Sequence, residues 1–390
     1  MTDFPPISSQ AAPRLVSVIL LALLAFSLAS VLAAFALDFA ADGNVWKQGD
    51  WLINTLNTEI RRGPLGTFIL RLSDLFNLDP VLAVLALQAL LLFPLYALFA
   101  RAALWPGLAV PALLLLASPA LFVLFWANDL QANGRKELLG MLGILLALVA
   151  RGDDRNSLLI LSVPVMAIAF IGHEVNLLLL PLYAALLLVG SEPYRRGRVI
   201  AVVLVALAAG AAFFYAISHP RIEDLNLICA PLLERGVPER FCAEGAISWM
   251  ERTSAQDRDM VLARNLPDGQ PLIFILAYIL AALPFAYLIS RSSAPGRWAL
   301  IALATVLPFL PLYAVALDWG RWMALHAFSA AIILIAGLRF DWLRLARPID
   351  WRILAVCVAV GLLWAQRQII GIRWGGTVDR GLEVLGQALG

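Results

Sequence analysis

The sequence predicts an all-α fold, a polytopic bundle of membrane-spanning helices, and its composition carries that prediction. Of its 390 residues, 62% are hydrophobic and only 14% are charged, and the mean hydropathy is +0.84. A soluble domain carries roughly a quarter charged residues, and a single soluble core stops growing near about 250–300 residues. Long apolar runs recur from Leu15 to Ile370, as in helices that cross a bilayer. The composition excludes a soluble enzyme, a disulfide-stapled module and a nucleic-acid-binding domain.

About eleven apolar stretches are predicted to span the membrane, within one integral membrane domain over residues 1–390. A span needs on the order of twenty apolar residues, and the stretches at 137–150 and 157–172 are shorter than that. The predicted spans are 14–37, 79–100, 106–126, 137–150, 157–172, 175–190, 198–217, 271–290, 298–317, 322–338 and 353–370.

Arginines in the short loops predict the orientation, because cytoplasmic loops are enriched in Lys and Arg. With a cytoplasmic N-terminus, the short inside loops hold a series of arginines, while the long loops 38–78 and 218–270 lie in the periplasm. Lys47 and Lys136 are the only lysines, and this arginine-rich composition indicates a bacterial source and hence a bacterial inner membrane. The arginines that set the orientation are Arg14, Arg101, Arg151, Arg155, Arg195, Arg196, Arg198, Arg291, Arg297, Arg339, Arg344, Arg347 and Arg352.

Each long outside loop has a structural feature of its own. Residues 56–78 place apolar side chains at helical spacing, which predicts a short amphipathic helix lying flat on the outer membrane face. Such a helix either seals the bundle or guides a substrate. In the second loop, Cys229 and Cys242 form a disulfide or stay as free thiols, and an oxidising periplasm permits the bond.

The polar residues that need an explanation gather at the predicted outer ends of the spans. Ionisable residues at membrane depth are costly and are usually functional. Their gathering on one side therefore predicts one wet cavity that opens to the periplasm. The clusters are Arg135-Lys136-Glu137, His173-Glu174 and Asp318-Trp319-Gly320-Arg321-Trp322, with Asp50 and Glu59 in the first loop.

Arg135 and Lys136 precede a predicted helix, where backbone N–H groups and the helix dipole already favour anions. The two cations would hold a diphosphate, with arginine supplying a bidentate fork. The alternative is a pair of basic side chains that extend towards the membrane surface, with Glu137 as a partner for the helix dipole.

His173 and Glu174 occupy a tight turn between two predicted spans. Either residue would serve as a general base on a hydroxyl group, with Glu174 orienting His173 in one version. The alternative is structural: Glu174 near the start of a helix suits the helix dipole, and His173 would satisfy loop carbonyls.

Asp318 and Arg321 lie between two tryptophans, Trp319 and Trp322. The indole faces would stack on sugar rings, and Arg321 would bind phosphate or pair with Asp318. The alternative is a belt of interfacial tryptophans with a local ion pair.

No cofactor is predicted. The chain has three histidines without HxxxH or HExxH spacing, so no metal site built by the protein is expected. It also has no phosphate-binding glycine loop, no dinucleotide fingerprint and no GxSxG motif.

Three short motifs, GRKELLGML, GHEVNLLLLPLY and DWGRWMALH, resemble bacterial exopolysaccharide and O-antigen polymerases of the Wzy and EpsG-like group. The resemblance implies a glycosyltransferase that joins undecaprenyl-diphosphate-linked oligosaccharide repeats at the periplasmic face, with the lipid diphosphate as leaving group. Its partners would be membrane lipids, a flippase and a chain-length regulator, and no nucleic acid.

The resemblance also implies roles for the clustered residues. Arg135, Lys136 and Arg321 would neutralise the departing diphosphate. His173, Glu174 or Asp318 would accept the proton of the attacking hydroxyl, and Glu137 joins these candidate acids. Asp50 and Glu59 rank behind them.

Three other functions stay open. A glycosyltransferase that uses a polyprenyl-monophosphate sugar would add a single residue and would use Asp50 or Glu59 as its base. A transporter or flippase for a lipid-linked sugar would need polar residues through the whole membrane, whereas the predicted spans are mostly apolar. A structural assembly subunit would tolerate alanine at all the clusters.

Overall fold

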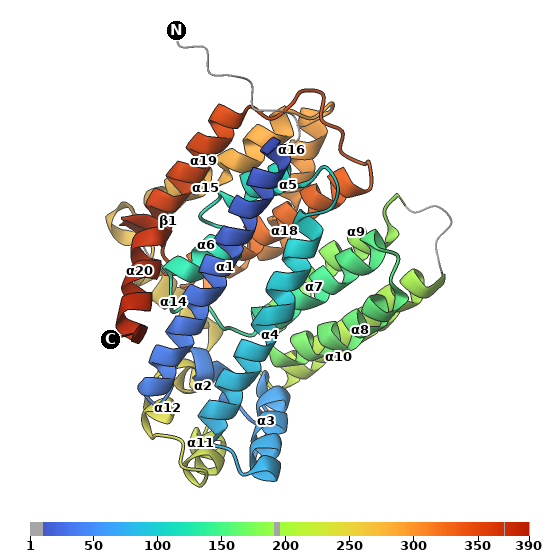
Figure 1. Ribbon diagram of the computed structural model, residues 1–390. Coiled ribbons are helices and arrows are strands. Elements are labelled where there is room, and N and C mark those ends of the chain that lie inside the picture. The colour runs from blue at the N-terminus through green and yellow to red at the C-terminus, as the bar shows by residue number, and fades with distance from the viewer. Residues whose placement is uncertain (1–10, 191–195, 370, 390) are drawn as a thin grey trace.

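The chain forms an all-α membrane protein. The computed structural model describes residues 11–190, 196–369 and 371–389, and it is 74% helical. Among the described residues, six helices are long and apolar enough to cross a membrane. The coarse prediction of a polytopic helical bundle is therefore confirmed (Figure 1).

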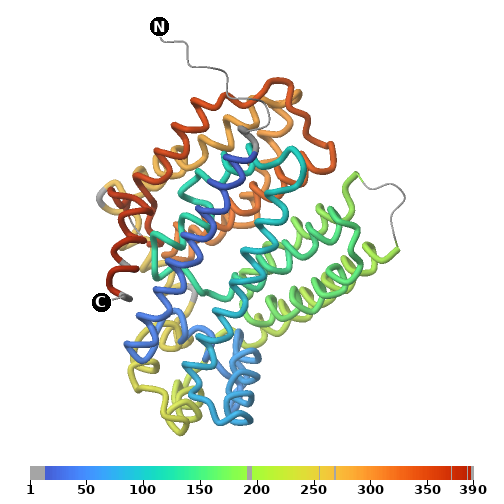
Figure 2. Tube along the Cα trace, viewed as in Figure 1, coloured from blue at the N-terminus to red at the C-terminus, as the bar shows by residue number. Residues whose placement is uncertain are grey.

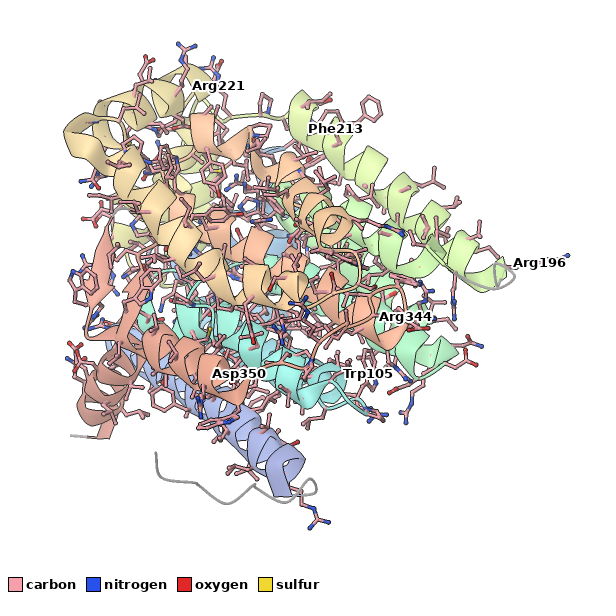
Figure 3. All side chains as sticks on the ribbon, turned by 90° about the horizontal axis from the view of Figure 1, so that it is seen from above. Trp105, Arg196, Phe213, Arg221, Arg344 and Asp350 are labelled. Atoms are coloured by element: carbon pink, nitrogen blue, oxygen red, sulfur yellow. A yellow bond between two sulfur atoms is a disulfide. The ribbon has the colours of Figure 1, made fainter. Side chains whose placement is uncertain are left out.

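Five of these six helices are continuous, and the sixth is a rod of three short pieces. The continuous helices are α1 (Ala11–Ala40), α4 (Pro80–Ala103), α10 (Arg196–Ser218), α15 (Gln270–Ser290) and α18 (Trp319–Arg339). The rod consists of α16 (Pro295–Ala304), η4 (Leu307–Phe309) and α17 (Leu312–Val315). Figure 3, an end-on view, shows α10 with its labelled Phe213 and Arg196 on the periphery of the bundle.

Shorter helices fill the space between the long ones. The predicted span 106–126 is divided into two helices by an irregular segment around Ser118, and the span 175–190 begins as a 3₁₀ helix. The shorter elements are α5 (Ala109–Leu116), α6 (Phe122–Asn128), α7 (Glu137–Gly152), α8 (Asn156–Gly172), η1 (Glu174–Leu179), α9 (Leu180–Leu188) and α19 (Trp351–Leu363).

Both long loops fold over the same end of the bundle, which we call the capped end (residues 41–79 and 219–269). The amphipathic helix predicted in the first loop is α3, which buries Leu65 and Ile69 and exposes Phe68 and Leu75. Cys229 and Cys242 form a disulfide in the second loop, so that open question is settled. The cap elements are α2 (Lys47–Leu52), α3 (Gly63–Phe76), α11 (Asn226–Leu233), α12 (Arg240–Ala243), α13 (Gly245–Ser248), η2 (Trp249–Glu251), α14 (Ser254–Arg264) and η3 (Pro267–Gly269).

The core of the bundle is built around α7 and α18. Every residue of α7 from Glu137 to Ala150 is buried, and so is α18 from Trp319 to Gly337. Each helix has charged residues only near its ends, Glu137 and Arg151 in α7 and Arg321 and Arg339 in α18. A helix that is apolar all round must lie inside the protein or the membrane. These two helices therefore place their charged first turns in the interior of the capped end.

The C-terminal region departs from the prediction of a last span at 353–370. Helix α19 ends at Leu363, and strand β1 (Trp364–Gln366) pairs antiparallel with β2 (Ile372–Trp374), with Ala365 opposite Arg373. Helix α20 (Gly376–Leu389) follows and packs beside α1 (Figure 2). The chain turns back because Gly361 of α19 packs directly on the carbonyl of Ala117, and the hairpin then bonds to the start of α18.

Gly66 allows the cap to close tightly on the bundle. A Cβ atom built on Gly66 would lie 1.9 Å from the carbonyl oxygen of Ile53, on the segment that follows α2. The side chains nearby are also buried, with Ile53 and Leu70 at 0% exposure, so the backbone has no room to move away. Only glycine fits where α3 crosses this segment.

We predict that Gly66→Ala lowers the free energy of unfolding by about 1–3 kcal/mol, the usual cost of overpacking a filled interior. The measurement is the thermal unfolding midpoint of the purified protein in detergent. Gly210→Ala on α10 is the matched control, because a Cβ atom there meets nothing within 4 Å. An unchanged midpoint for Gly66→Ala would show that the cap does not depend on this close contact.

Candidate functional site

Three helices begin at one place under the cap, and each begins beside a carboxylate. Helix α7 starts with Glu137, η1 starts with Glu174, and Asp318 occupies the N-cap position of α18. Helix N-termini carry partial positive charge, which negative side chains stabilise. Each of the three acids therefore lies where the dipole of its own helix stabilises its negative charge.

Arg321 joins the first turns of α18 and α7. Its guanidinium donates to the carboxylate of Glu137 and to that of Asp318, and it stacks over the indole of Trp322 at 4.8 Å. Gln368, from the segment after β1, donates its side-chain amide to Asp318 at 3.0 Å. All these groups are held in fixed directions by partners on separate elements.

Arg61 and Arg62 together bind Glu174. Nη1 of Arg61 lies 2.5 Å from one carboxylate oxygen, and Arg62 donates to both oxygens through Nε and Nη2 at 2.5–3.1 Å. Arginine binds a carboxylate most strongly through such paired hydrogen bonds. Glu174 is thus fully occupied and ties the first cap loop to η1.

Asp50 differs from the other acids. Its side chain is 2% exposed and lines the cavity described below. Within the described part of the chain, its Oδ2 has no hydrogen-bond partner, and Oδ1 lies 4.0 Å from Arg62. Burial alone would raise the pKa of Asp50, but the surrounding positive charges, Lys136 first, outweigh it and lower the pKa to about 2. Asp50 is therefore an ionised carboxylate with one buried oxygen that has no hydrogen-bond partner among the described residues.

Short helix α2 holds Asp50 in place through the side chains around it. The Trp51 indole donates to the carbonyl of Gly134 at 2.8 Å, and the Gln48 amide donates to Gln88 of α4, also at 2.8 Å. Lys47 forms a buried ion pair with Asp38 at the end of α1. Asp50 is thus fixed to α1, α4 and the segment before α7.

Two cations precede α7 and reach in different directions. Arg135 donates to the carbonyl of Trp46, while its Nε has no partner among the described residues. Lys136 is fully buried, and its ammonium donates to the carbonyl of Arg62 at 3.0 Å. Burial lowers the pKa of Lys136 to about 8, although the negative charge of Asp50 opposes the shift. Lys136 is therefore charged at neutral pH but close to its titration point.

His173 is neutral and already bonded. Burial and the charge of Arg62 lower its pKa to about 4. Its Nδ1 accepts the backbone N–H of Val175 at 3.1 Å, so the ring proton resides on Nε2, which faces Glu137 at 3.9 Å. In this arrangement neither ring nitrogen is free to accept a proton from a ligand.

These groups surround a cavity of about 330 Å³ at the capped end. One wall is polar and comes from the bundle and the first loop. Another part of the lining comes from Trp46 of the first loop and Trp249 of the second loop, whose indoles meet edge to face at 5.3 Å. The cavity is lined by Trp46, Asp50, Arg61, Arg62, Gln131, Arg135, His173, Ala246, Trp249, Met250, Asp257, Arg264, Leu317, Asp318, Arg321, Gln368 and Ile369.

The structure brings most of the predicted site residues together. Five line the cavity: Asp50, Arg135, His173, Asp318 and Arg321. Three more lie immediately behind it, in contact with lining residues: Lys136, Glu137 and Glu174.

The other predicted residues lie away from the cavity. Trp319 packs against Phe274 and Tyr313, and Trp322 lies beneath Arg321. Glu59 is exposed and accepts a hydrogen bond from the Tyr215 hydroxyl at 2.6 Å.

Sequence reasoning did not assign roles to several lining residues. Arg61 and Arg62 form a basic pair in an acid-rich loop, and this departure from the charge trend was a usable signal. Trp249 and Gln368 carried no comparable signal, because each depends on how a distant segment folds back over the bundle.

No protein-family model, curated protein or solved structure matches this chain. Among the described residues, no group of three His, Cys, Asp or Glu side chains is arranged to hold a metal ion. The residues and geometry of the cavity are therefore the basis for assigning a function.

We predict that Arg321→Met destabilises the protein by about 3–5 kcal/mol, because it leaves Glu137 as an uncompensated buried charge. The double variant Glu137→Gln/Arg321→Met removes both charges and recovers at least half of that loss. Thermal unfolding of the two variants and of Glu137→Gln completes the cycle. If the double variant is no more stable than Arg321→Met, the ion pair does not organise this end of the bundle.

Proposed function

We propose that the protein is a membrane glycosyltransferase that takes a sugar from a polyprenyl-phosphate-linked donor and uses Asp50 as its general base. One observation carries the proposal: among the described residues the Oδ2 of Asp50 has no hydrogen-bond partner and its ion pair with Arg62 spans 4.0 Å, whereas Glu137, Glu174 and Asp318 accept hydrogen bonds from arginines. The base among the first-loop acids is therefore Asp50 rather than Glu59.

The charge of the site supports a phosphate leaving group. Five cations, with four carboxylates among them, leave one net positive charge around the cavity, and a lipid phosphodiester carries one negative charge. Arginines in rigid positions stabilise developing phosphate charge without reorganising. The cations are Arg61, Arg62, Arg135, Lys136 and Arg321, and the carboxylates are Asp50, Glu137, Glu174 and Asp318.

In the proposed step, the Asp50 carboxylate removes the proton from an acceptor hydroxyl as its oxygen attacks the anomeric carbon of the donor sugar. The bond from that carbon to the phosphate oxygen breaks, and the phosphate leaves with the electron pair. A bound donor brings negative charge among the same cations that lower the pKa of Asp50. Binding therefore raises this pKa and makes the carboxylate a stronger base.

The tryptophan wall supports a sugar acceptor. Trp46 and Trp249 line the same cavity as Asp50 with partly exposed side chains, and amphipathic aromatic rings offer apolar area at low entropic cost. The second loop, which carries Trp249, would thus contribute to acceptor binding.

We propose that the capped end faces the periplasm of a bacterial inner membrane and that the N-terminus is cytoplasmic. The short-loop arginines that the structure describes lie at the opposite end, and the disulfide lies in the cap, both as this orientation requires. Eleven spans would follow if α5–α6, α7, α8, η1–α9 and α19 join the six long helices.

The second candidate is the polymerase of diphosphate-linked oligosaccharide repeats. The motif resemblance supports it. Arg264 and Asp257 also line the cavity, but they add one charge of each sign, so the net charge stays at +1. A transporter is less well supported, because the cavity groups gather at one end of the bundle.

We predict that Asp50→Asn lowers transfer by about 10²–10⁴-fold, the usual effect of losing a general base, while the variant still reaches the membrane. The measurement is the mass and gel profile of cell-surface glycans from a strain whose own copy is deleted. The matched control, Glu59→Gln, retains wild-type product. Full activity of Asp50→Asn would overturn the assignment of the base.

The same profile separates the two candidates. If the protein transfers a single sugar residue, cells with the Asp50→Asn variant should make glycans of normal length that lack one sugar. A polymerase predicts loss of long chains and accumulation of single lipid-linked repeats.

We predict that affinity for undecaprenyl phosphate falls about tenfold between pH 7 and pH 9.5. Burial lowers the pKa of Lys136 to about 8, so the residue is charged at pH 7 and loses its proton as the pH rises through 8. Removing one charge near a partly dry anion site has an effect of this size. Lys136→Arg stays charged and should bind equally well across the range. A similar fall in Lys136→Arg would assign the titration to another group.

A further inference from the structure

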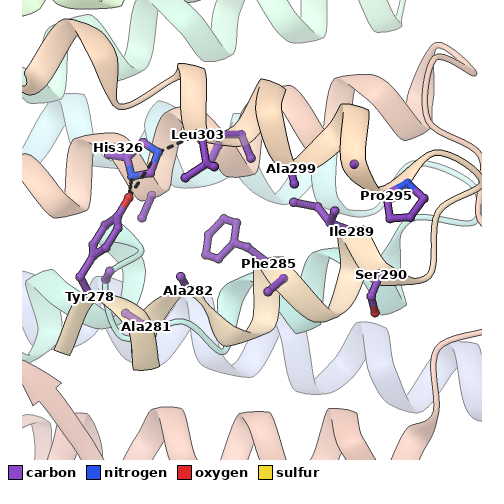
Figure 4. A pocket seen from close by; sticks show the side chains of 16 residues that line it. Tyr278, Ala281, Ala282, Phe285, Ile289, Ser290, Pro295, Ala299, Leu303 and His326 are labelled. Carbon is purple, nitrogen blue, oxygen red and sulfur yellow. Dashed lines mark hydrogen bonds between the residues drawn. The ribbon is translucent and has the colours of Figure 1, made fainter. Parts of the chain in front are cut away.

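A second cavity, apolar and larger than the first, lies between α15, α16 and α18. Its volume is about 490 Å³ (Figure 4). Small side chains on all three helices create it, since no bulky group fills the space between them. The alanines that form its floor and walls are Ala281, Ala282, Ala299, Ala302, Ala327 and Ala330. We call it the alanine groove.

The alanine groove faces lipid rather than water. Its lining, within the described part of the chain, includes no Asp, Glu, Lys or Arg side chain. The residues next to it on α15 and α16 are strongly exposed, with Leu300 at 70% and Leu283 at 50% exposure. Because these helices are apolar enough to span a membrane, the exposed leucines are in contact with lipid chains. A ligand of the groove must therefore be an apolar chain.

The polar end of the groove does not attract a headgroup. His326 Nε2 donates to the carbonyl of Ala302 at 3.1 Å, and the Tyr278 hydroxyl bonds to His326 Nδ1 (Figure 4). Both side chains are thus satisfied within the protein. Ser290, at the other end, donates its hydroxyl to the carbonyl of Tyr287 at 2.7 Å, so each polar side chain that lines the groove has a partner among the described residues, and a headgroup would be held elsewhere.

The first cavity, which we call the cationic cavity (the lining around Asp50, Arg135 and Arg321), lies further toward the capped end. Helix α18 carries Arg321 in the cationic cavity and His326 at the end of the groove, five residues or ~7.5 Å along the helix. From Tyr278 to Ser290 the groove then follows α15 for ~18 Å, away from the capped end. Trp319 and Phe274 pack together on the capped side of His326 and Tyr278, so a lipid with its tail in the groove and its anionic head in the cationic cavity would pass over this aromatic pair.

We propose that the alanine groove binds a stretch of the isoprenoid tail of the lipid-linked donor. This inference rests on the proposed function, because it takes the anionic head of that donor to lie in the cationic cavity. The groove would add affinity for long tails and would position the phosphate beside Arg321.

The test compares two lipids that share a phosphate head and differ in tail length. Undecaprenyl phosphate and farnesyl phosphate are titrated against the full-length protein in nanodiscs, and affinities are read by native mass spectrometry. The wild type should bind undecaprenyl phosphate at least tenfold more tightly. Ala299→Trp and Ala282→Trp fill the groove and should abolish that preference while leaving farnesyl phosphate binding unchanged.

Leu300→Trp is the matched control, since it lies beside Ala299 on α16 but does not line the groove. It should keep the wild-type preference. A preference that survives both groove variants would overturn the proposal and would leave ordinary phospholipid chains as the occupant. The proposed function fails separately if Arg135→Ala leaves farnesyl phosphate binding unchanged, because that short lipid reports on the cationic cavity alone.

Discussion

The ion pair between Arg321 and Glu137 is the interaction on which the rest of the site depends. It joins the first turns of α18 and α7, the two helices with the most deeply buried faces. Charges inside a protein are tolerated only when partners and further hydrogen bonds surround them. Asp318, Gln368 and the indole of Trp322 supply those partners. The polar network therefore extends from this pair, and the segment after β1 must fold back to complete it.

A division of roles among the carboxylates follows from their positions. Glu137, Glu174 and Asp318 each lie at a helix start, where the dipole and an arginine hold the negative charge. Asp50 lies on α2, a six-residue helix of the cap, and its Oδ2 has no hydrogen-bond partner among the described residues. An acid that stabilises a helix end and an arginine is poorly placed to exchange a proton. In the proposed reaction the framework acids fix the cations, and Asp50 performs the chemistry.

The sequence predicted a membrane protein and most of the residues around the cavity. Burying a charge in a membrane is costly, so Arg135 and Asp318 at the ends of predicted spans indicated a functional site. The sequence placed His173 ahead of Asp50. The tautomer of His173 and the unpartnered oxygen of Asp50 depend on residues distant in the chain, which a sequence pattern does not reveal. Gly320 is helical, and only glycine fits there because a Cβ atom would lie 2.1 Å from the carbonyl oxygen of Arg367. The returning hairpin that creates this contact was predicted to be part of a membrane span.

Helix α18 connects the two environments that a lipid-linked sugar occupies. Its first turn presents Arg321 to the cationic cavity, and its next turns present His326, Ala327 and Ala330 to the alanine groove. In the proposed function, α18 would therefore contact both the phosphate and the tail of one donor. A helix buried on all sides cannot tilt without disturbing the packing around it. The distance between head and tail sites is thus fixed by the core of the bundle, while the sugars meet the cap. Because of this separation, changes in the cap loops would alter which acceptor binds without changing how the lipid is held.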